Sequence, residues 1–382
     1  IEWEVIGIVI GATVFVEIAS RRGIFAWISM RILKVSHGDP FSLLAWLSVL
    51  TVVFSAFLDN ITAMIIIGSL TIVACRKLGL DAKPFLITEG IMTNIGGLLT
   101  LISSLPNVIV GKAANISYLD FVITAGPYVA VTVIATLALA RWMFGTKVAA
   151  LADEKARAQN RAFVEAFDEW ETVEDFRFFY TSIGAVILVI LGFALKDQIP
   201  LVREFGIEVV AMGAAVVMML LHAKNVEHDL DRVEWSLVFF FIGLFTVIGV
   251  MPEAGVLEQI GVLLSYVTRQ TGSAGLMWLT AGFSSVTDNI PLAAMLAKIF
   301  SQSTEPVPMV QWWAVVFGAN LGGNITPIGS ASTVVACTLM KKHDMPIAFL
   351  DFVKIGGVFA VMQLLLATGY LAILSWLWTP AT

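Results

Sequence analysis

The sequence has little of what soluble enzymes and metalloproteins are built from. Only 14% of its 382 residues are charged, and only Cys75 and Cys337 are cysteines. Two cysteines give no disulfide framework, and no Cys/His cluster has the spacing of metal ligands, so we expect no structural metal site. The net charge of −6 is spread over the chain without a basic stripe, which excludes nucleic acid as a partner.

Nucleotide and catalytic motifs are also absent from the sequence. No G-x-x-x-x-G-K-[ST] sequence occurs, so ATP-driven pumping would need a separate ATPase partner subunit. No catalytic constellation is recognisable, and we predict that the protein is not an enzyme and needs no cofactor. The chain begins at Ile1 without methionine or a basic n-region. We therefore expect residues to precede it and infer no signal peptide.

Apolar residues are abundant instead. They make up 58% of the chain, and the mean hydropathy is +0.88, which favours a lipid bilayer as the solvent. A membrane-spanning helix needs about 20 apolar residues. Several stretches approach that length with few charges, namely 121–142, 207–222, 235–250 and 352–378. The sequence therefore predicts an all-α polytopic membrane protein.

The chain also repeats itself. Residues 55–61 (SAFLDNI) match residues 284–290 (SSVTDNI), and residues 94–108 match residues 320–334, with Asn, Gly, Gly, Thr, Ile, Ser and Val in register. Because the matches follow the same order in both halves, the pattern predicts a duplicated unit.

Lysine and arginine placement predicts the orientation of the two repeats, because these residues favour the cytoplasmic side of short loops. Basic residues flank the first Asp-Asn segment on both sides: Arg21, Arg22, Arg31 and Lys34 before it, and Arg76, Lys77 and Lys83 after it. That segment should enter and leave by one face, as a re-entrant hairpin. The second hairpin then opens to the opposite face. This inverted topology is typical of secondary transporters with substrate at the repeat interface, here in the inner (cytoplasmic) membrane.

The predicted organisation follows from this charge map. Its parts are repeat 1 over 1–145, with a hairpin at 41–75 and a broken helix at 86–110; a cytoplasmic polar linker over 146–178; two connecting transmembrane helices over 179–232; and repeat 2 over 233–382, with a hairpin at 275–300 and a broken helix at 309–340.

Each hairpin carries an Asp-Asn pair, Asp59-Asn60 in the first and Asp288-Asn289 in the second. An ionised carboxylate in hydrocarbon costs several kcal/mol, so both aspartates should face a cavity, a cation or an exchangeable proton. The simpler interpretation is that each aspartate caps the helix that follows it. The two roles are compatible, and a sodium ion near Asp59 and Asp288 would find suitable oxygen ligands.

The two broken segments combine glycines with amides and hydroxyls inside apolar runs. The candidate substrate-binding residues there are Asn94, Gly96, Gly97, Thr100, Ser103, Ser104 and Asn107 in the first, and Asn320, Gly322, Gly323, Asn324, Thr326, Ser330 and Ser332 in the second. Non-helical backbone at membrane depth persists only where protein or water satisfies its polar groups. Small-residue helix packing would explain the glycines, but it would not explain the amides and hydroxyls.

Two further charged residues are candidates for proton coupling beside Asp59 and Asp288. Glu89 lies little more than one helical turn before Asn94 and could relay protons. Lys298 follows Asp288 by ten residues, and it either neutralises that aspartate or extends toward the membrane surface.

Four motifs, FLDNITAMIII, TNIGGLLTLISSLPNVIV, SSVTDNIPLAAM and GANLGGNITPIGSASTVVA, resemble those of the arsenite permease and NhaD sodium/proton antiporter family. That family lies in a wider ion-transporter superfamily with the melanosomal P protein and the citrate and dicarboxylate carriers. The resemblance implies a scaffold domain and a transport domain around one central site, often in a homodimer. The family's site positions fall on Asp59, Asn60, Asn94, Gly96, Thr100, Ser103, Asp288, Asn289, Asn320, Gly322, Thr326 and Ser330.

The same comparison bears on the substrate. Dicarboxylate carriers have Ser-Asn-Thr in their hairpins, whereas this chain has Leu58-Asp59-Asn60, which argues against a carboxylate. The leading hypothesis is efflux of arsenite and antimonite by alternating access, driven by the proton-motive force. The alternative is a sodium or lithium/proton antiporter. A channel or receptor is less favoured, because inverted repeats with broken segments are typical of alternating access.

Overall fold

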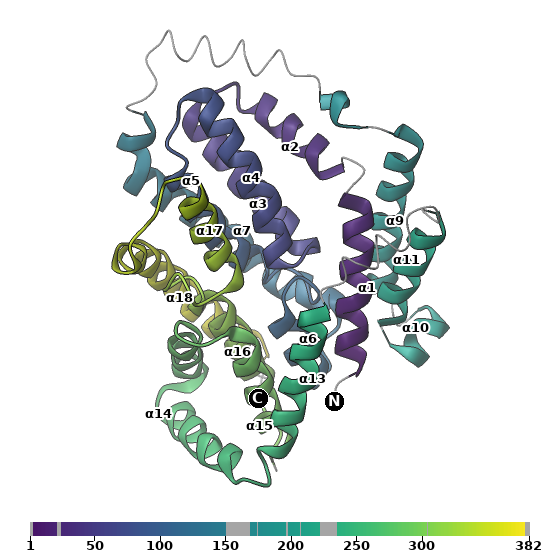
Figure 1. Cartoon of the computed structure of the whole chain (residues 1–382). Coiled ribbons are helices and arrows are strands. Elements are labelled where there is room, and N and C mark those ends of the chain that lie inside the picture. Colours follow the sequence, from purple (N-terminus) through teal and green to yellow (C-terminus); the bar gives the residue numbers. More distant parts are fainter. Residues whose placement is uncertain are drawn as a thin grey trace. The chain divides into compact units, whose positions relative to one another are not determined.

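The computed structural model describes residues 3–20, 24–149, 169–173, 175–195, 198–206, 208–221, 235–303 and 305–378. Every regular element in these ranges is a helix (Figure 1), so the all-helical prediction is confirmed. Five of the described helical spans are long and apolar enough to cross a membrane: Pro40–Phe57, Asn60–Leu78, Tyr118–Gly145, Phe176–Ala194 and Phe349–Trp378. This composition fits a polytopic membrane protein.

The chain forms two compact units. The first comprises Ile1–Val35 and Ala162–Gly249, and the second comprises Ser36–Arg161 and Val250–Thr382. The helices of the first unit are α1 (Trp3–Ser20), α2 (Ile24–Val35), the 3-10 helix η1 (Glu169–Thr172), α9 (Phe176–Ala194), α10 (Pro200–Phe205), α11 (Glu208–Leu221) and α13 (Trp235–Val250), whose last residue is assigned to the second.

In the first unit, η1 is joined to α2 by ion pairs and aromatic contacts. Arg31 and Lys34 both pair with the carboxylate of Glu169, whose side chain is only 6% exposed. The Lys34 hydrogen bond, reinforced by the backbone amide of Glu169 and by Arg31, lowers the pKa of Glu169 to about 2. The ring centroids of Trp27 and Trp170 lie 5.2 Å apart beside this pair. Glu169 is therefore a largely buried carboxylate that stays ionised.

The second unit contains all the predicted site residues. Its helices are α3 (Pro40–Phe57), α4 (Asn60–Leu78), α5 (Lys83–Gly96), α6 (Leu105–Ala113), α7 (Tyr118–Ala149), α14 (Val256–Ser284), α15 (Asn289–Ser301), α16 (Met309–Gly322), α17 (Ala331–Lys342) and α18 (Phe349–Trp378).

Short turns that carry the Asp-Asn motifs join α3 to α4 and α14 to α15. Asp39 caps α3 by accepting from the backbone N–H of Ser42 at 2.8 Å, and Pro40 occupies its first turn, where no donor is lost. In the second pair, α14 is kinked at Gly272, whose φ of 66° is open to glycine and strained for other residues. The kink divides α14 before the part that packs beside the motif.

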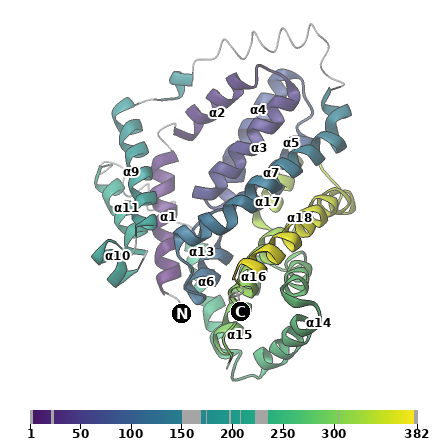
Figure 2. The same cartoon turned by 180° about the vertical axis from the view of Figure 1, so that it is seen from behind.

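The helices that follow each pair are interrupted. The first run stops with α5 at Gly96 and resumes with α6 at Leu105, while the second stops with α16 at Gly322 and resumes with α17 at Ala331. Long helices α7 and α18 then lie beside each other (Figure 2). The Tyr128 hydroxyl donates to the Gln363 carbonyl at 2.9 Å, and the Tyr370 hydroxyl donates to the Thr124 carbonyl at 2.6 Å.

Several boundaries predicted from the sequence stay predictions. The arms α3 and α4 have 18 and 19 residues and are each long enough to cross a membrane, so a re-entrant course is not required by their length. Most of the predicted linker 146–178, the basic segment 224–232, and Arg21 and Arg22 lie outside the described residues.

Candidate functional site

The two helix pairs of the second unit pack crosswise against the two interrupted helices. The arm α4 contacts α17, and the arm α15 contacts α6. Each arm therefore lies against the later part of the interrupted helix from the other half of the sequence. This arrangement places the two interruptions in one region.

Asparagine and serine side chains join the two interruptions. The Asn94 amide donates to Asn324 Oδ1 and to Ser330 Oγ, both at 2.8 Å. The Ser104 hydroxyl donates to Asn320 Oδ1 at 2.8 Å. All five residues are buried. We call these residues together with Asn107 and Ser332 the amide–hydroxyl cluster.

The same Asn–Ser link is made twice, from equivalent positions. Aligning Asn94 with Asn320 also aligns Ser104 with Ser330. The asparagine of each half therefore bonds the serine of the other half. Reciprocal contacts of this kind are expected where two copies of one unit face each other.

Two further hydrogen bonds recur in each half. The Thr100 hydroxyl donates to the Ala56 carbonyl at 2.7 Å, and the aligned Thr326 donates to the Ser285 carbonyl at 2.5 Å. A serine four residues before the aspartate of each Asp-Asn motif likewise donates to the helix beside it: Ser55 to the Thr93 carbonyl and Ser284 to the Ala319 carbonyl, both at 2.6 Å. The hairpin tips are thus fixed to the interruptions in matching ways.

Side chains also satisfy the carbonyl groups that the first interruption exposes. The Asn107 amide donates to the carbonyls of Gly97 at 2.6 Å and Thr100 at 3.0 Å, while its Oδ1 accepts from Asn320 Nδ2 at 3.0 Å. Ser103 Oγ lies 2.7 Å from the same two carbonyls. Because unsatisfied buried carbonyls cost free energy, these bonds explain why the non-helical backbone persists.

Glycines allow the close helix approach on which this geometry depends. A Cβ at Gly96 would lie 2.6 Å from the Val52 carbonyl oxygen, and one at the aligned Gly322 would overlap the Ala281 carbonyl. A Cβ at Gly97 would lie 3.2 Å from Asn60 Oδ1. Small-residue packing accounts for these glycines, and the amides and hydroxyls have the separate function of joining the two halves.

The aspartates of the Asp-Asn motifs are exposed N-caps. Asp59 accepts from the N–H groups of Ile61 and Thr62 at 3.0 and 2.9 Å, and Asp288 accepts from that of Ile290 at 3.0 Å. The asparagine in each motif is less exposed than the aspartate. Asn60 Oδ1 accepts from Ser55 at 2.7 Å, and its Nδ2 lies 3.5 Å from Asn94 Oδ1, so Asn60 lies at the edge of the cluster. Asn289 is buried.

Lys298 does not neutralise Asp288 directly. It lies in the last turn of α15, whereas Asp288 caps the first turn, about 15 Å away along the axis at 1.5 Å per residue. No ion pair within the described ranges includes Lys298, which is exposed. At this end of α15, the positive charge of Lys298 interacts favourably with the helix dipole.

Sequence reasoning missed Gln363 and Thr136, which extend the cluster to the long helices. Asn324 Nδ2 donates to Gln363 Oε1 at 2.8 Å, and Gln363 Nε2 donates to Thr136 Oγ1 at 3.2 Å. All three side chains are buried. The available signal was a single amide within the apolar run of α18.

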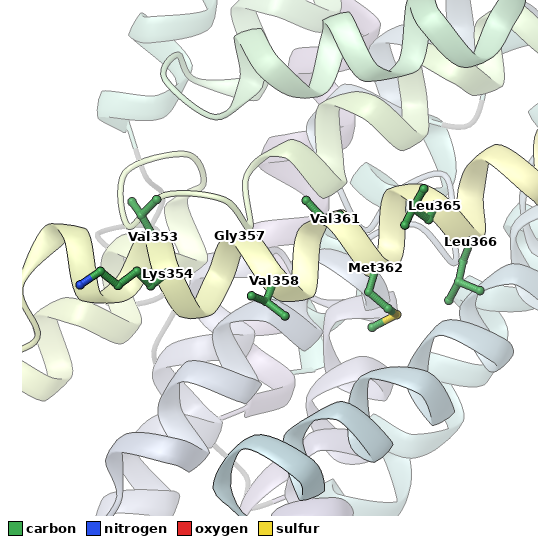
Figure 3. A pocket seen from close by; sticks show the side chains of 8 residues that line it. All are labelled: Val353, Lys354, Gly357, Val358, Val361, Met362, Leu365 and Leu366. Carbon is green, nitrogen blue, oxygen red and sulfur yellow. The ribbon is translucent and has the colours of Figure 1, made fainter.

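A groove along α18 lies outside this set of residues. In the described part of the chain it is lined by Val353, Lys354, Gly357, Val358, Val361, Met362, Leu365 and Leu366 (Figure 3). Lys354 is its one charged residue and lies 3.4 Å from Asp351. An apolar face of this kind suits contact with lipid, and none of the eight belongs to the predicted site.

An all-helical membrane protein whose halves meet in one buried, neutral polar cluster has the form of a transporter. Residues 1–318 match the citrate transporter family (CitMHS). The chain therefore belongs to that family and is a multi-pass membrane transporter, not an enzyme.

Relatives extend over nearly the whole chain. A 46 kDa membrane protein of Mycobacterium leprae is 31% identical over 383 residues, which cover 97% of this chain and 86% of the relative. An uncharacterized transporter of Mycobacterium tuberculosis is 29% identical over 382 residues, with the same coverage. The human P protein is 26% identical over 450 residues, covering 98% of this chain and 54% of its own.

These matches refine the family predicted from the motifs. The predicted relation to the P protein and the citrate carriers is confirmed. The motifs predicted the narrower family of arsenite permeases and NhaD antiporters, whereas the family that matches is that of the citrate transporters.

Proposed function

We propose that the chain is a proton-coupled secondary transporter of the inner (cytoplasmic) membrane that exports arsenite and antimonite by alternating access. The observation that carries this proposal is the neutral character of the amide–hydroxyl cluster. Its hydrogen bonds involve Asn, Ser, Thr and Gln side chains and backbone groups. Arsenite and antimonite are neutral hydroxides near pH 7, and such solutes both donate and accept hydrogen bonds.

The proposed mechanism uses the repeat. The reciprocal links between Asn94 and Ser330 and between Asn320 and Ser104 support two inverted repeats that approach one site from opposite membrane faces. Opening to one face would break one link and leave its counterpart closed. The two hairpins and two broken helices would form the transport domain of the molecule, with a scaffold that can form a homodimer.

Coupling requires a group that exchanges a proton. Asp59 and Asp288 are exposed at the hairpin tips, Glu89 is buried near the cluster, and Lys298 lies at the far end of α15. These four residues are the candidates for that group, and a separate ATPase subunit would be needed only for ATP-driven export.

The alternative is a sodium or lithium/proton antiporter. It is favoured by the oxygen-rich first interruption, where the Gly97 and Thr100 carbonyls converge on Ser103 and Asn107. Hard cations prefer such carbonyl and hydroxyl oxygens. The family description also raises citrate, but the cationic partners that carboxylates usually require are not among the described hydrogen-bond partners of the cluster.

Purified protein in proteoliposomes, with an internal pH probe, distinguishes these substrates. Arsenite, antimonite, sodium, lithium and citrate are added separately, and antimonite uptake is measured in parallel against protein-free vesicles. We expect proton flux and uptake with antimonite and proton flux with arsenite. Proton flux with sodium, lithium or citrate alone, without antimonite uptake, would overturn the proposed substrate.

A further inference from the structure

We infer that Glu89 is the residue that carries the transported proton, at a site present in the first half of the sequence and replaced in the second. Its role in transport rests on the proposed function. Glu89 lies on α5 and is 1% exposed. Its Oε1 accepts a hydrogen bond from the Thr71 hydroxyl of α4 at 2.6 Å.

The other carboxyl oxygen has no partner. Glu89 Oε2 makes no hydrogen bond within the described residues, and no described ion pair includes Glu89. A buried carboxylate without a cation and with one donor is costly, by several kcal/mol. The geometry suits the neutral acid, with Oε1 accepting from Thr71 and the proton on Oε2. Release of that proton requires water to reach Oε2.

Close packing of three helices keeps water from this carboxyl. A Cβ added at Gly68 of α4 would lie 2.6 Å from Leu339 Cδ1 of α17 and 3.3 Å from Leu86 Cδ2 of α5. One added at Gly90 of α5 would lie 3.1 Å from Ala336 Cβ of α17. Because Glu89 is 1% exposed, its carboxyl would exchange the proton when α4 and α17 move away from α5, which is a movement of the kind that alternating access requires.

The helices that contact α5 carry no second buried carboxyl among their described residues. The thiol of Cys75 on α4 is buried and titratable, and α3 and α16 carry no titratable residue. Among the side chains that the structure describes, the remaining titratable groups on helices that contact α5 are the helix-end residues Arg76, Lys77, Lys341 and Lys342, the thiol of Cys337, the exposed Asp120, Arg141, Asp351 and Lys354, and the tyrosines Tyr118, Tyr128 and Tyr370.

The Glu89 site is connected to the amide–hydroxyl cluster through α17. Ser332 Oγ lies 3.3 Å from the Gly90 carbonyl and 3.2 Å from Asn94 Oδ1. Asn94 itself is about 7.5 Å beyond Glu89 along the helix axis. A displacement of α17 that opens the cluster would therefore also change the surroundings of Glu89, which is the physical requirement for coupling.

The repeat shows that the fold does not need a carboxyl at this position. Aligning Asn94 with Asn320 places Val315 opposite Glu89, and aligning Asn60 with Asn289 places Phe300 opposite Thr71. Val315 is buried, so the second half fills the equivalent space with apolar side chains. Asp59 and Asp288, in contrast, occur in both halves and both cap helices. Of these three acidic residues, Glu89 is the one without an acidic counterpart in the other half.

The test compares wild type with Glu89→Gln in two measurements. Infrared difference spectra of the full chain in lipid, recorded while pH changes, detect protonated carboxyl groups without any substrate. We expect a carboxyl band in the wild type that Glu89→Gln removes. In proteoliposomes, Glu89→Gln should lose uphill antimonite transport driven by a proton gradient but retain antimonite exchange at equal pH. Glu169→Gln is the matched control, because Glu169 is also largely buried but ion-paired. This variant should keep both the carboxyl band and the uphill antimonite transport.

The outcomes separate this inference from the proposed substrate. A wild-type carboxyl band that persists unchanged in Glu89→Gln would overturn the role of Glu89, as would full proton-driven transport by that variant. If the wild type transports no antimonite, the proposed substrate is wrong, and the infrared band still decides whether Glu89 exchanges a proton. If Glu89→Gln does not fold, Glu89→Asp should shift the frequency of the band, and an unshifted band would contradict the assignment.

Discussion

At the scale of single residues, the site uses amides where a charged group would be costly. An asparagine both donates and accepts, so Asn94 can bond Asn324 and Ser330 while its Oδ1 lies near Ser332. Within a low-dielectric region such a network is strong when complete and expensive when one partner is missing. The two halves are therefore joined by bonds that are individually modest and collectively specific.

Serine substitutions should show how much the hydrogen bonds between the two halves stabilise the protein. Ser104→Ala leaves Asn320 Oδ1 without its donor, and we expect the free energy of unfolding to fall by about 1–3 kcal/mol. Ser330→Ala should cost about 1 kcal/mol more, because Ser330 also caps α17 at the Thr333 N–H. Ser48 is the control, since its buried hydroxyl has no partner in the described residues. Thermal unfolding in detergent measures all three, and a Ser48→Ala loss as large as the others would contradict the network.

Residue-level prediction from sequence succeeded only in part. Polar residues inside apolar runs indicated the asparagines and serines that the structure brings together. The sequence left open whether Asp59 caps a helix, and the structure shows that it does. Gln363 was missed because a single amide on a long helix has no periodic partner in the sequence.

At the scale of elements, the decisive feature is how closely the first arm of each hairpin approaches the interrupted helix. Gly96 and Gly322 lie against the carbonyls of Val52 and Ala281, which fixes α5 on α3 and α16 on α14. The sequence predicted the interruptions because glycine and hydroxyl residues end helices. It did not predict the crosswise contacts of α4 with α17 and of α15 with α6, since these depend on tertiary packing and not on local preference.

Replacing these glycines should separate the helices. Gly96→Ala and Gly322→Ala each force a methyl group into a backbone carbonyl, and overpacking of this kind costs about 1–3 kcal/mol. Gly357→Ala on α18 is the control, because nothing lies within 4 Å of its added Cβ, and a helical alanine should be neutral or stabilise by roughly 0.5–1 kcal/mol. Unfolding midpoints in detergent provide the comparison. Equal stability of all three variants would be incompatible with the close approach.

At the scale of the whole molecule, the account joins a family assignment to an internal symmetry. The chain belongs to the citrate transporter family, and aligned residues of its two halves make matching hydrogen bonds in one unit. The proposed transporter uses this symmetry to open alternately to each face, with one asymmetric acid, Glu89, for the proton. Substrate identity depends on fine chemistry within the cluster, which is why sequence motifs shared across a superfamily do not determine it.

The most direct test of the central claim measures antimonite exchange across proteoliposomes at equal pH for Asn94→Ala and Asn320→Ala. Both variants should lose most exchange, because the equivalent asparagines of the two halves form one site. Gln311→Ala is the control, an amide on the same helix as Asn320 and outside the cluster, and it should exchange at the wild-type rate. Loss in one asparagine variant with full exchange in the other would contradict a single site shared by both repeats.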